Sequence, residues 1–457
     1  MNDPSSPALH QTEPESEKLR IAKPSQSAIS TPPWPLTLRI GFRFCFVYFG
    51  LFCLSTQVLS GMFNFPLVDI PEFGTLWPLR QIITWTAPHI FHIHRDLVFT
   101  ETGSGDRSVD WILIFVFAIF AIVATVFWSL LDRRRTEYSR LHAYFRLFIR
   151  FALAGQLMMY GLDKVFPVQM PYPGLSRLLE PFGNFSQMGV LWASIGASPS
   201  YERFGGFAEL AAGVLLLFPR TTLLGALVAA ADMTQVFMLN MAYDVPVKIF
   251  SFHLLLLSIF LLAPDLFRVL TLFFRNKPVA APAASPIFRS RRATRIALAV
   301  QLLYGTALLG FGIRDAWKTW YEYGGGAPKP PLYGIWEVDE YSLDGKVLQP
   351  TVTEKDRWRR LLIESSHLGG LQLMDDSLAF YNPAFDLGKH SLVLTARRQK
   401  DFHAQFSFEQ SDPNQLTLDG DMNSHKIHAQ LHLLDDSKKF PLREAKFHWI
   451  NEYPVNQ

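Results

Sequence analysis

Seven apolar stretches, separated by polar or basic loops, occupy most of the first two-thirds of the chain. A helix needs about 20 mostly apolar residues to cross a hydrocarbon core about 30 Å thick. The stretch 111–131 meets this need most clearly, because it reads WILIFVFAIFAIVATVFWSLL and holds no charged side chain. The pattern therefore predicts about seven transmembrane helices, at residues 37–60, 111–131, 145–165, 204–219, 221–242, 246–263 and 294–314.

The N-terminal segment, residues 1–35, is rich in Pro, Ser and Glu and has no hydrophobic period, which predicts a disordered tail. A cleavable signal peptide would place an apolar stretch within about the first 30 residues. No such stretch is found there, so we expect the first apolar stretch, 37–60, to act as an uncleaved signal anchor.

Arginine and lysine cluster in two loops, over residues 133–146 and 268–295. Basic loops of membrane proteins stay in the cytoplasm. The N-terminal tail is therefore expected in the cytoplasm, and the loops 62–109, 166–203 and 243–246 are expected outside it. Seven crossings then place the C-terminal part outside as well, and we predict a multi-pass protein of the bacterial inner (plasma) membrane.

A second domain is predicted after the last apolar stretch, beyond a hinge rich in Gly and Pro at residues 324–332. Residues 333–457 contain short segments of alternating apolar and polar residues with turn signals between them. Six to eight strands of this kind in about 125 residues predict an all-β antiparallel barrel or sandwich. By the topology above, this domain is extracytoplasmic.

The first strand of this domain carries Gly334 and Trp336 in a Gly-x-Trp pattern. The pattern resembles the first strand of the lipocalins, which are small up-and-down barrels. The resemblance implies that Trp336 plugs one end of the barrel and that an arginine such as Arg357 or Arg359 stacks on it. A generic β-sandwich is the alternative interpretation.

The chain accordingly divides into segments of different character. They are a disordered cytoplasmic tail (1–35), two transmembrane helices with a long outer loop (36–144), a four-helix core (145–275), a basic cytoplasmic loop with the last transmembrane helix (276–323), the hinge (324–332) and the β-domain (333–457).

Composition supports a membrane protein and excludes several other classes. Hydrophobic residues make up 49% of the 457 residues and charged residues only 18%, against about 25% in soluble domains. The net charge of +3 gives no reason to expect a nucleic-acid partner. Cys45 and Cys53 lie eight residues apart, about 12 Å along a helix, so they cannot pair and a dithiol relay lacks its residues.

Polar side chains inside the apolar stretches are the candidate functional residues. Gln156, Tyr160 and Lys164 follow one another at four-residue spacing, so they share one helix face. Charged groups at this depth cost roughly 2.5–3.5 kcal/mol each, so they are expected to face the bundle interior and to pair. Lys164, Arg150 and Lys248 are candidate partners of Glu209. The full set of pocket candidates is Gln156, Tyr160, Lys164, Glu209, Asp232, Gln235, Lys248 and His253.

Two interpretations of this set remain open. Either its members form ion pairs that hold the bundle together, or they line a polar pocket for a quinone headgroup, another small ligand or a proton path. The histidines at 89–94 and 425–432 are more typical of an amphipathic segment and a solvated strand than of metal ligands, so we predict no metal site.

Four motifs in sequence order resemble the DoxX-like family of small bacterial four-helix membrane proteins, over residues 145–270. They are Gly161-Leu162-Asp163-Lys164, GFAELAAGVLLLFPRTT, LNMAYDVPVKIFSFHLLLL and APDLFRVL. The resemblance implies a DoxX-like four-helix core in which Lys164 and Glu209 are the family-like polar residues. Named members are subunits of a thiosulfate:quinone oxidoreductase or partners in membrane oxidoreductase complexes.

Two hypotheses for function follow from these observations. In the first, the protein is a subunit of a membrane oxidoreductase system or a partner of one, and its intramembrane pocket holds a small molecule such as a quinone. It would associate with a membrane oxidoreductase or form a homo-oligomer. In the second, it is a non-enzymatic protein anchored in the lipid bilayer, whose outer β-domain holds a lipid, a small apolar ligand or a protein partner. No catalytic residue is assigned, and whether the protein is an enzyme is left open.

Overall fold

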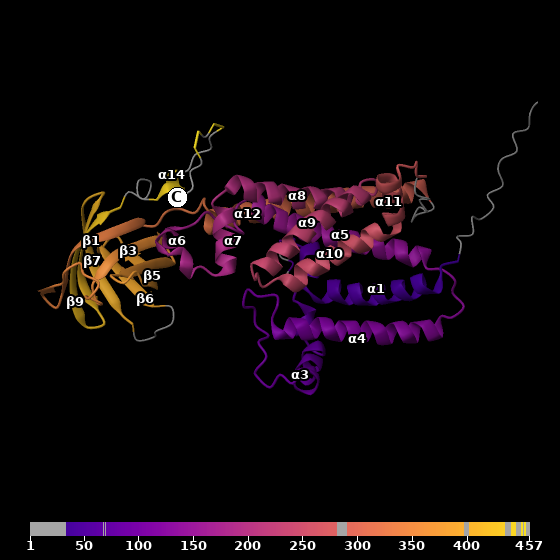
Figure 1. Ribbon diagram of the computed structural model, residues 1–457, viewed down its shortest axis with the longest axis horizontal. Coiled ribbons are helices and arrows are strands. Elements are labelled where there is room, and N and C mark those ends of the chain that lie inside the picture. The colour runs from indigo at the N-terminus through magenta and orange to yellow at the C-terminus, as the bar shows by residue number, and fades with distance from the viewer. Residues whose placement is uncertain are drawn as a thin grey trace, which may run out of the picture.

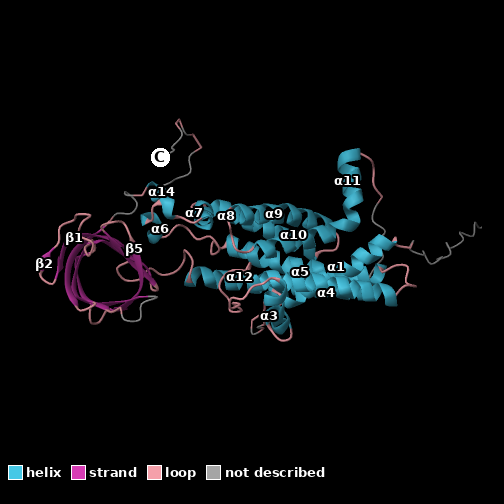
Figure 2. Cartoon of the chain, turned by 60° about the horizontal axis from the view of Figure 1, so that its bottom comes forward, coloured by secondary structure: helices cyan, strands magenta, loops and turns pink. Residues whose placement is uncertain are grey.

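The protein consists of a bundle of helices followed by a β-barrel, which lies at one end of the bundle (Figures 1 and 2). The computed structural model describes residues 33–66, 68, 70–280, 290–396, 402–434, 440–444, 449–450 and 452–453. The predicted disordered tail falls almost entirely outside these residues.

Helices occupy each of the apolar stretches found in the sequence. They are α1 (Leu36–Ser55), α4 (Ser108–Leu131), α5 (Ser139–Val165), α8 (Pro199–Leu217), α9 (Thr222–Ala242), α10 (Lys248–Leu262) and α12 (Arg291–Glu322). By length and composition, the described residues hold five helical segments able to cross a membrane: α1, α4, α9, α10 continued by α11, and α12. These helices are compatible with a membrane protein, and membrane insertion with seven crossings stays a prediction.

Most of the shorter helices lie in loops that the sequence left without structure. Helix α2 (Gln57–Met62) occupies the end of the predicted span 37–60, because α1 ends at Ser55. The loop that follows contains the 3-10 turn η1 (Phe73–Thr75) and α3 (Leu79–Ile90). The loop between α5 and α8 contains α6 (Leu175–Leu179), η2 (Phe182–Asn184) and α7 (Gln187–Gly196). The turn η3 (Ala263–Asp265) and α11 (Leu266–Arg275) follow α10, and α14 (Pro441–Glu444) follows the barrel.

Helix α5 packs closely against α8 through glycines on both helices. A Cβ atom on Gly161 would lie 2.8 Å from the backbone nitrogen of Leu210, and one on Gly206 would lie 2.7 Å from the carbonyl oxygen of Gly161. Small residues of this kind let helix backbones approach each other. Gly205 lies beside this contact, and a Cβ there would meet nothing within 4 Å.

The β-domain is a closed antiparallel barrel of eight strands, so the barrel alternative is confirmed and the sandwich is wrong. The strands are β1 (Gly334–Leu343), β3 (Trp358–Ser365), β4 (Leu368–Leu373), β5 (Leu378–Asp386), β6 (Ser391–Ala396), β7 (Ala404–Asp412), β8 (Gln415–Met422) and β9 (His425–Leu433). Each pairs with the next in chain order, and β9 pairs with β1 to close the ring; the short β2 (Lys346–Val347) pairs only with β1. Closure leaves the eight strands without an open edge.

Large buried side chains fill the barrel. Trp336, Trp358 and Phe406 are each about 1% exposed and pack in one apolar cluster with Leu361 and Leu418. The indole nitrogen of Trp336 donates to the carbonyl oxygen of Leu332 at 2.9 Å, which ties the first strand to the hinge.

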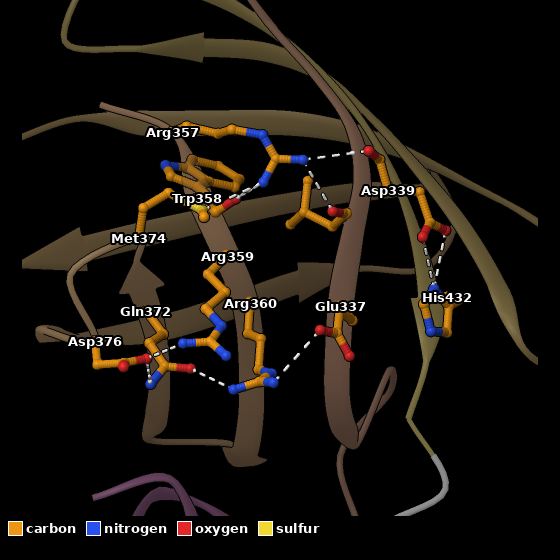
Figure 3. A network of polar contacts seen from close by, with 11 residues as sticks. Glu337, Asp339, Arg357, Trp358, Arg359, Arg360, Gln372, Met374, Asp376 and His432 are labelled. Carbon is orange, nitrogen blue, oxygen red and sulfur yellow. Dashed lines mark hydrogen bonds and ion pairs between the residues drawn. The ribbon is translucent and has the colours of Figure 1, made fainter. Parts of the chain in front are cut away.

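The two arginines expected to stack on Trp336 make other contacts (Figure 3). The buried guanidinium of Arg357 donates to the carbonyl oxygens of Val338 at 3.1 Å and Trp358 at 3.0 Å. Arg359 forms an ion pair with Asp376. The buried guanidinium of Arg357 therefore has backbone carbonyls as hydrogen-bond acceptors, because buried polar groups in proteins are almost always hydrogen-bonded.

The barrel contacts the bundle through α6. Leu175 and Leu179 of α6 pack against Ile335 and Leu362, which lie on the outer face of β1 and β3. The same outer face carries a polar network that includes Arg360, whose guanidinium donates to Gln372 at 3.0 Å (Figure 3). The barrel is thus attached to the segment that connects α5 and α8.

Candidate functional site

A cavity of about 280 Å³ lies between α5, α7, α8, α9 and α10. Its wall is mostly apolar, with polar side chains from each of these elements except α7. Six sequence candidates line it: Gln156, Tyr160, Lys164, Glu209, Asp232 and Gln235. Lys248 and His253 do not line it.

Lys164 and Glu209 form an ion pair across the contact between α5 and α8. The Glu209 side chain is only 2% exposed, and its Oε1 atom takes the Lys164 ammonium while Oε2 has no hydrogen-bond partner among the described residues. The other two candidate partners are engaged elsewhere: Arg150 donates to Gln301 at 2.9 Å, and the Lys248 ammonium lies 2.8 Å from Asp244. Because α5 and α8 approach each other closely, Lys164 is the basic residue that pairs with Glu209.

Gln156 and Tyr160 are held by the α2 region. The Gln156 amide donates to the carbonyl oxygens of Gln57 at 3.1 Å and Val58 at 3.4 Å, and the Gln57 amide donates to the Tyr160 hydroxyl at 3.1 Å. A side chain at Gly61 would collide with the Gln156 amide, since a Cβ there would lie 1.7 Å from Nε2. These contacts leave Oε1 of the fully buried Gln156 without a donor among the described residues.

Unpartnered acceptor oxygens are concentrated in the residues of the cavity wall. Such an oxygen costs roughly 1–3 kcal/mol when nothing donates to it. They are Gln156 Oε1, Gln169 Oε1, Glu202 Oε2, Glu209 Oε2 and Asp232 Oδ2. Among the described lining residues, Lys164 carries the one ammonium that faces the three carboxylates. The wall is therefore rich in acceptors and poor in charged donors.

The segment between α5 and α8, together with the first turn of α8, forms another part of the wall. Oε1 of Glu202 accepts from the backbone nitrogen of Met170 at 2.9 Å, and the Trp192 indole donates to the carbonyl oxygen of Gln169 at 2.9 Å. All four residues line the cavity. Sequence reasoning missed them because they lie in a predicted loop; the clue was Glu202, two residues before an apolar stretch.

Lys248 lies at the N-terminus of α10, outside the cavity wall. Asp106 lies in a Gly-Ser-Gly-Asp turn at residues 103–106 and accepts from the backbone nitrogens of Lys248 and Ile249, each at 2.9 Å. The Lys248 ammonium lies 2.8 Å from Asp244 and 3.6 Å from Asp106. A carboxylate at a helix N-terminus satisfies free N–H groups. The turn therefore caps α10.

His253 lies between α10 and α1. Its ring stacks on Phe52 with the centroids 4.0 Å apart, and its Nδ1 donates to the carbonyl oxygen of Ile249 at 2.6 Å. This fixes Nε2 as the acceptor of the Tyr48 hydroxyl, at 2.8 Å. His253 thus joins two helices and is fully engaged there.

The described histidines of β9 each lie beside an aspartate. His425, His428 and His432 contact Asp344, Asp419 and Asp339 at 2.7, 2.6 and 2.9 Å. Within the described part of the chain, no group of three or more His, Cys, Asp or Glu side chains is arranged to hold a metal ion. Cys45 and Cys53 are both free thiols.

Comparison with known proteins shows one relationship. The chain is 31% identical over 146 residues to the uncharacterized protein YwoB of Bacillus subtilis (strain 168), a match that takes 32% of this chain and 90% of the relative. The chain belongs to the family of YwoB. No protein-family model and no solved structure matches it. The match covers about a third of this chain, so most of the chain lies outside the part that is similar to YwoB.

Proposed function

We propose that this YwoB relative is a DoxX-like protein of the bacterial inner membrane that binds the headgroup of a small amphipathic molecule in its helical bundle, with a quinone as the leading candidate. One observation carries the proposal: the Lys164–Glu209 ion pair lies in a cavity wall with the second Glu209 oxygen unpartnered. Electrons would pass to or from a partner oxidoreductase.

Polar and charged side chains in the cavity wall add little to the stability of the helix bundle. Burying an ion pair contributes little to stability, and well-packed apolar residues of the same volume often do better. Here the glycine contacts already bring α5 and α8 together. Ionisable groups inside a membrane therefore favour binding or transport over a purely structural role.

The cavity suits a headgroup about the size of one ring. Small-molecule pockets run from about 300 to 1,000 Å³, and this one, at about 280 Å³, is just below that range. A quinone carbonyl can accept from the Lys164 ammonium, and a quinol hydroxyl can donate to the free Glu209 oxygen. The pair thus offers one partner to each redox form.

The alternative, a lipid or apolar ligand held inside the β-domain, has less support. The barrel interior is filled by Trp336, Trp358, Phe406 and their neighbours, so a ligand there would have to displace them. The contact of the outer barrel face with α6 instead supports a role in holding the segment that covers the cavity.

Mass spectrometry of small molecules that stay bound to the detergent-purified full-length protein tests the proposal. We expect a quinone with the wild type, and its loss in folded Lys164→Ala and Glu209→Gln variants. Lys248→Ala is the matched control, because Lys248 is also an ion-paired lysine of the bundle but does not line the cavity. Absence of quinone from every sample, or its retention in both cavity variants, would contradict the proposal.

A further inference from the structure

Helix α11 departs from the direction of the long helices. Pro264 lies in the turn η3 between α10 and α11, where its missing N–H interrupts the helical hydrogen bonds. Figure 2 shows α11 running across the direction of α1 and α4, at the end of the bundle opposite the barrel. A helix in this position runs along the surface of any membrane that α1 and α4 cross.

The corner before α11 is held by ion pairs. Asp265 pairs with Arg268 of α11, and its Oδ2 lies 3.7 Å from the guanidinium of Arg146 on α5. At the other end, Asn276 adopts a left-handed conformation with φ of 47°, which ends the helix. The direction of α11 is therefore set by contacts with the bundle.

One side of α11 is apolar and exposed. Phe267, Phe273 and Phe274 are 68%, 67% and 80% exposed, and none of the residues of α11 is buried. At 3.6 residues per turn, these three share one arc of the helix with Leu266 and Leu270. An apolar side of this size needs a covering partner.

The opposite side of α11 is polar and positively charged. Arg268 and Arg275 lie on that side together with Leu272, and Lys277 follows the helix. Residues 266–280 contain no acidic side chain. A short helix with an aromatic face and a basic face is typical of one that lies in a membrane interface.

We propose that α11 is an in-plane anchor, which inserts Phe267, Phe273 and Phe274 into the boundary between headgroups and acyl chains of the leaflet on the N-terminal side. Arg268, Arg275 and Lys277 then lie at the level of the anionic phospholipid headgroups, which attract basic residues beside a membrane span. The occupant of the apolar face is lipid because the face is bordered by cations and the described chain holds five helical segments able to cross a membrane. A second copy of the chain is the competing occupant.

Spin-label accessibility in the full chain, reconstituted in phosphatidylcholine–phosphatidylglycerol vesicles, tests this placement. Cys45→Ala and Cys53→Ala remove the native thiols, and labels are attached at Phe274→Cys on the apolar face and at Arg275→Cys, which is exposed on the polar side. The logarithm of oxygen over nickel-chelate accessibility is expected to be positive at 274 and negative at 275. Phe267→Cys replaces Phe274→Cys if that variant does not fold.

Two results would overturn the proposal. Negative values at both positions would place α11 in water. A label at 274 that neither reagent reaches, with dipolar broadening of its spectrum, would show that a second copy covers the face. The attraction to anionic lipid is checked in vesicles of phosphatidylcholine alone, where the value at 274 should become smaller. An unchanged accessibility value at 274 would show that anionic headgroups do not contribute to the binding of α11 to the membrane.

Discussion

The carboxylate of Glu364 on β3 accepts a hydrogen bond from the backbone nitrogen of Ser176 at 2.9 Å. This contact joins two residues 188 positions apart and caps the first turn of α6. Residues of the same α5–α8 segment, Met170 and Trp192, line the cavity. The barrel and the cavity are therefore joined through one short stretch of chain.

Loss of the Glu364 carboxylate should loosen that stretch. In Glu364→Ala the Ser176 N–H loses its acceptor, which costs about 1 kcal/mol for a partly exposed hydrogen bond. Hydrogen exchange of residues 175–196 should become faster while the barrel strands keep their protection. Glu340→Ala, an exposed glutamate of β1, is the control and should change neither region. Equal exchange in both variants would show that the contact does not hold the segment.

Two neighbouring glycines of α8 should respond in opposite ways to the same substitution. Gly206→Ala would place a Cβ 2.7 Å from the carbonyl oxygen of Gly161, a backbone atom that cannot rotate away, and should destabilise the protein by about 1–3 kcal/mol. Gly205→Ala meets nothing within 4 Å and should be neutral or stabilising by up to about 1 kcal/mol. Thermal unfolding in detergent compares the two. A similar loss in both variants would mean that the helix contact is not as described.

Glu72, in the loop that precedes η1, should make stability depend on pH. Burial, together with the nearby Asp110 carboxylate, raises the pKa of Glu72 above its usual value. A carboxyl group with a raised pKa in the folded state contributes stability at low pH that is lost as the pH rises through that pKa. Glu72→Gln should therefore raise the thermal stability at pH 7–8 and leave it nearly unchanged near pH 4. A constant difference across this range would show that ionisation of Glu72 is not the cause.

Much of the local structure could be predicted from the sequence. The apolar stretches are helices because only a helix satisfies every backbone group within an apolar segment. The alternating segments after residue 333 are strands because one face meets a core and the other meets solvent. Between α5 and α8, the helices α6 and α7 could not be predicted, since they are short and become stable by packing on other elements.

The candidate site was predictable as a set of residues, while its geometry was not. Helical spacing placed Gln156, Tyr160 and Lys164 on one face, and these three line the cavity. The partner of Glu209 could not be chosen among three basic residues, because the choice depends on how closely two helices approach. His253 belonged to the same set by composition, yet stacking on Phe52 places it in another contact.

The sequence by itself determined which segments are apolar helices, which are strands, and that charged groups lie among the helices. Tertiary structure alone decided that β9 pairs with β1 to close the barrel, that Lys164 is the partner of Glu209, and that α11 turns across the bundle. The physical reason is the distance along the sequence over which each interaction acts. Periodicity and propensity act over a few neighbouring residues, whereas these three outcomes depend on contacts between segments brought together only by the whole fold.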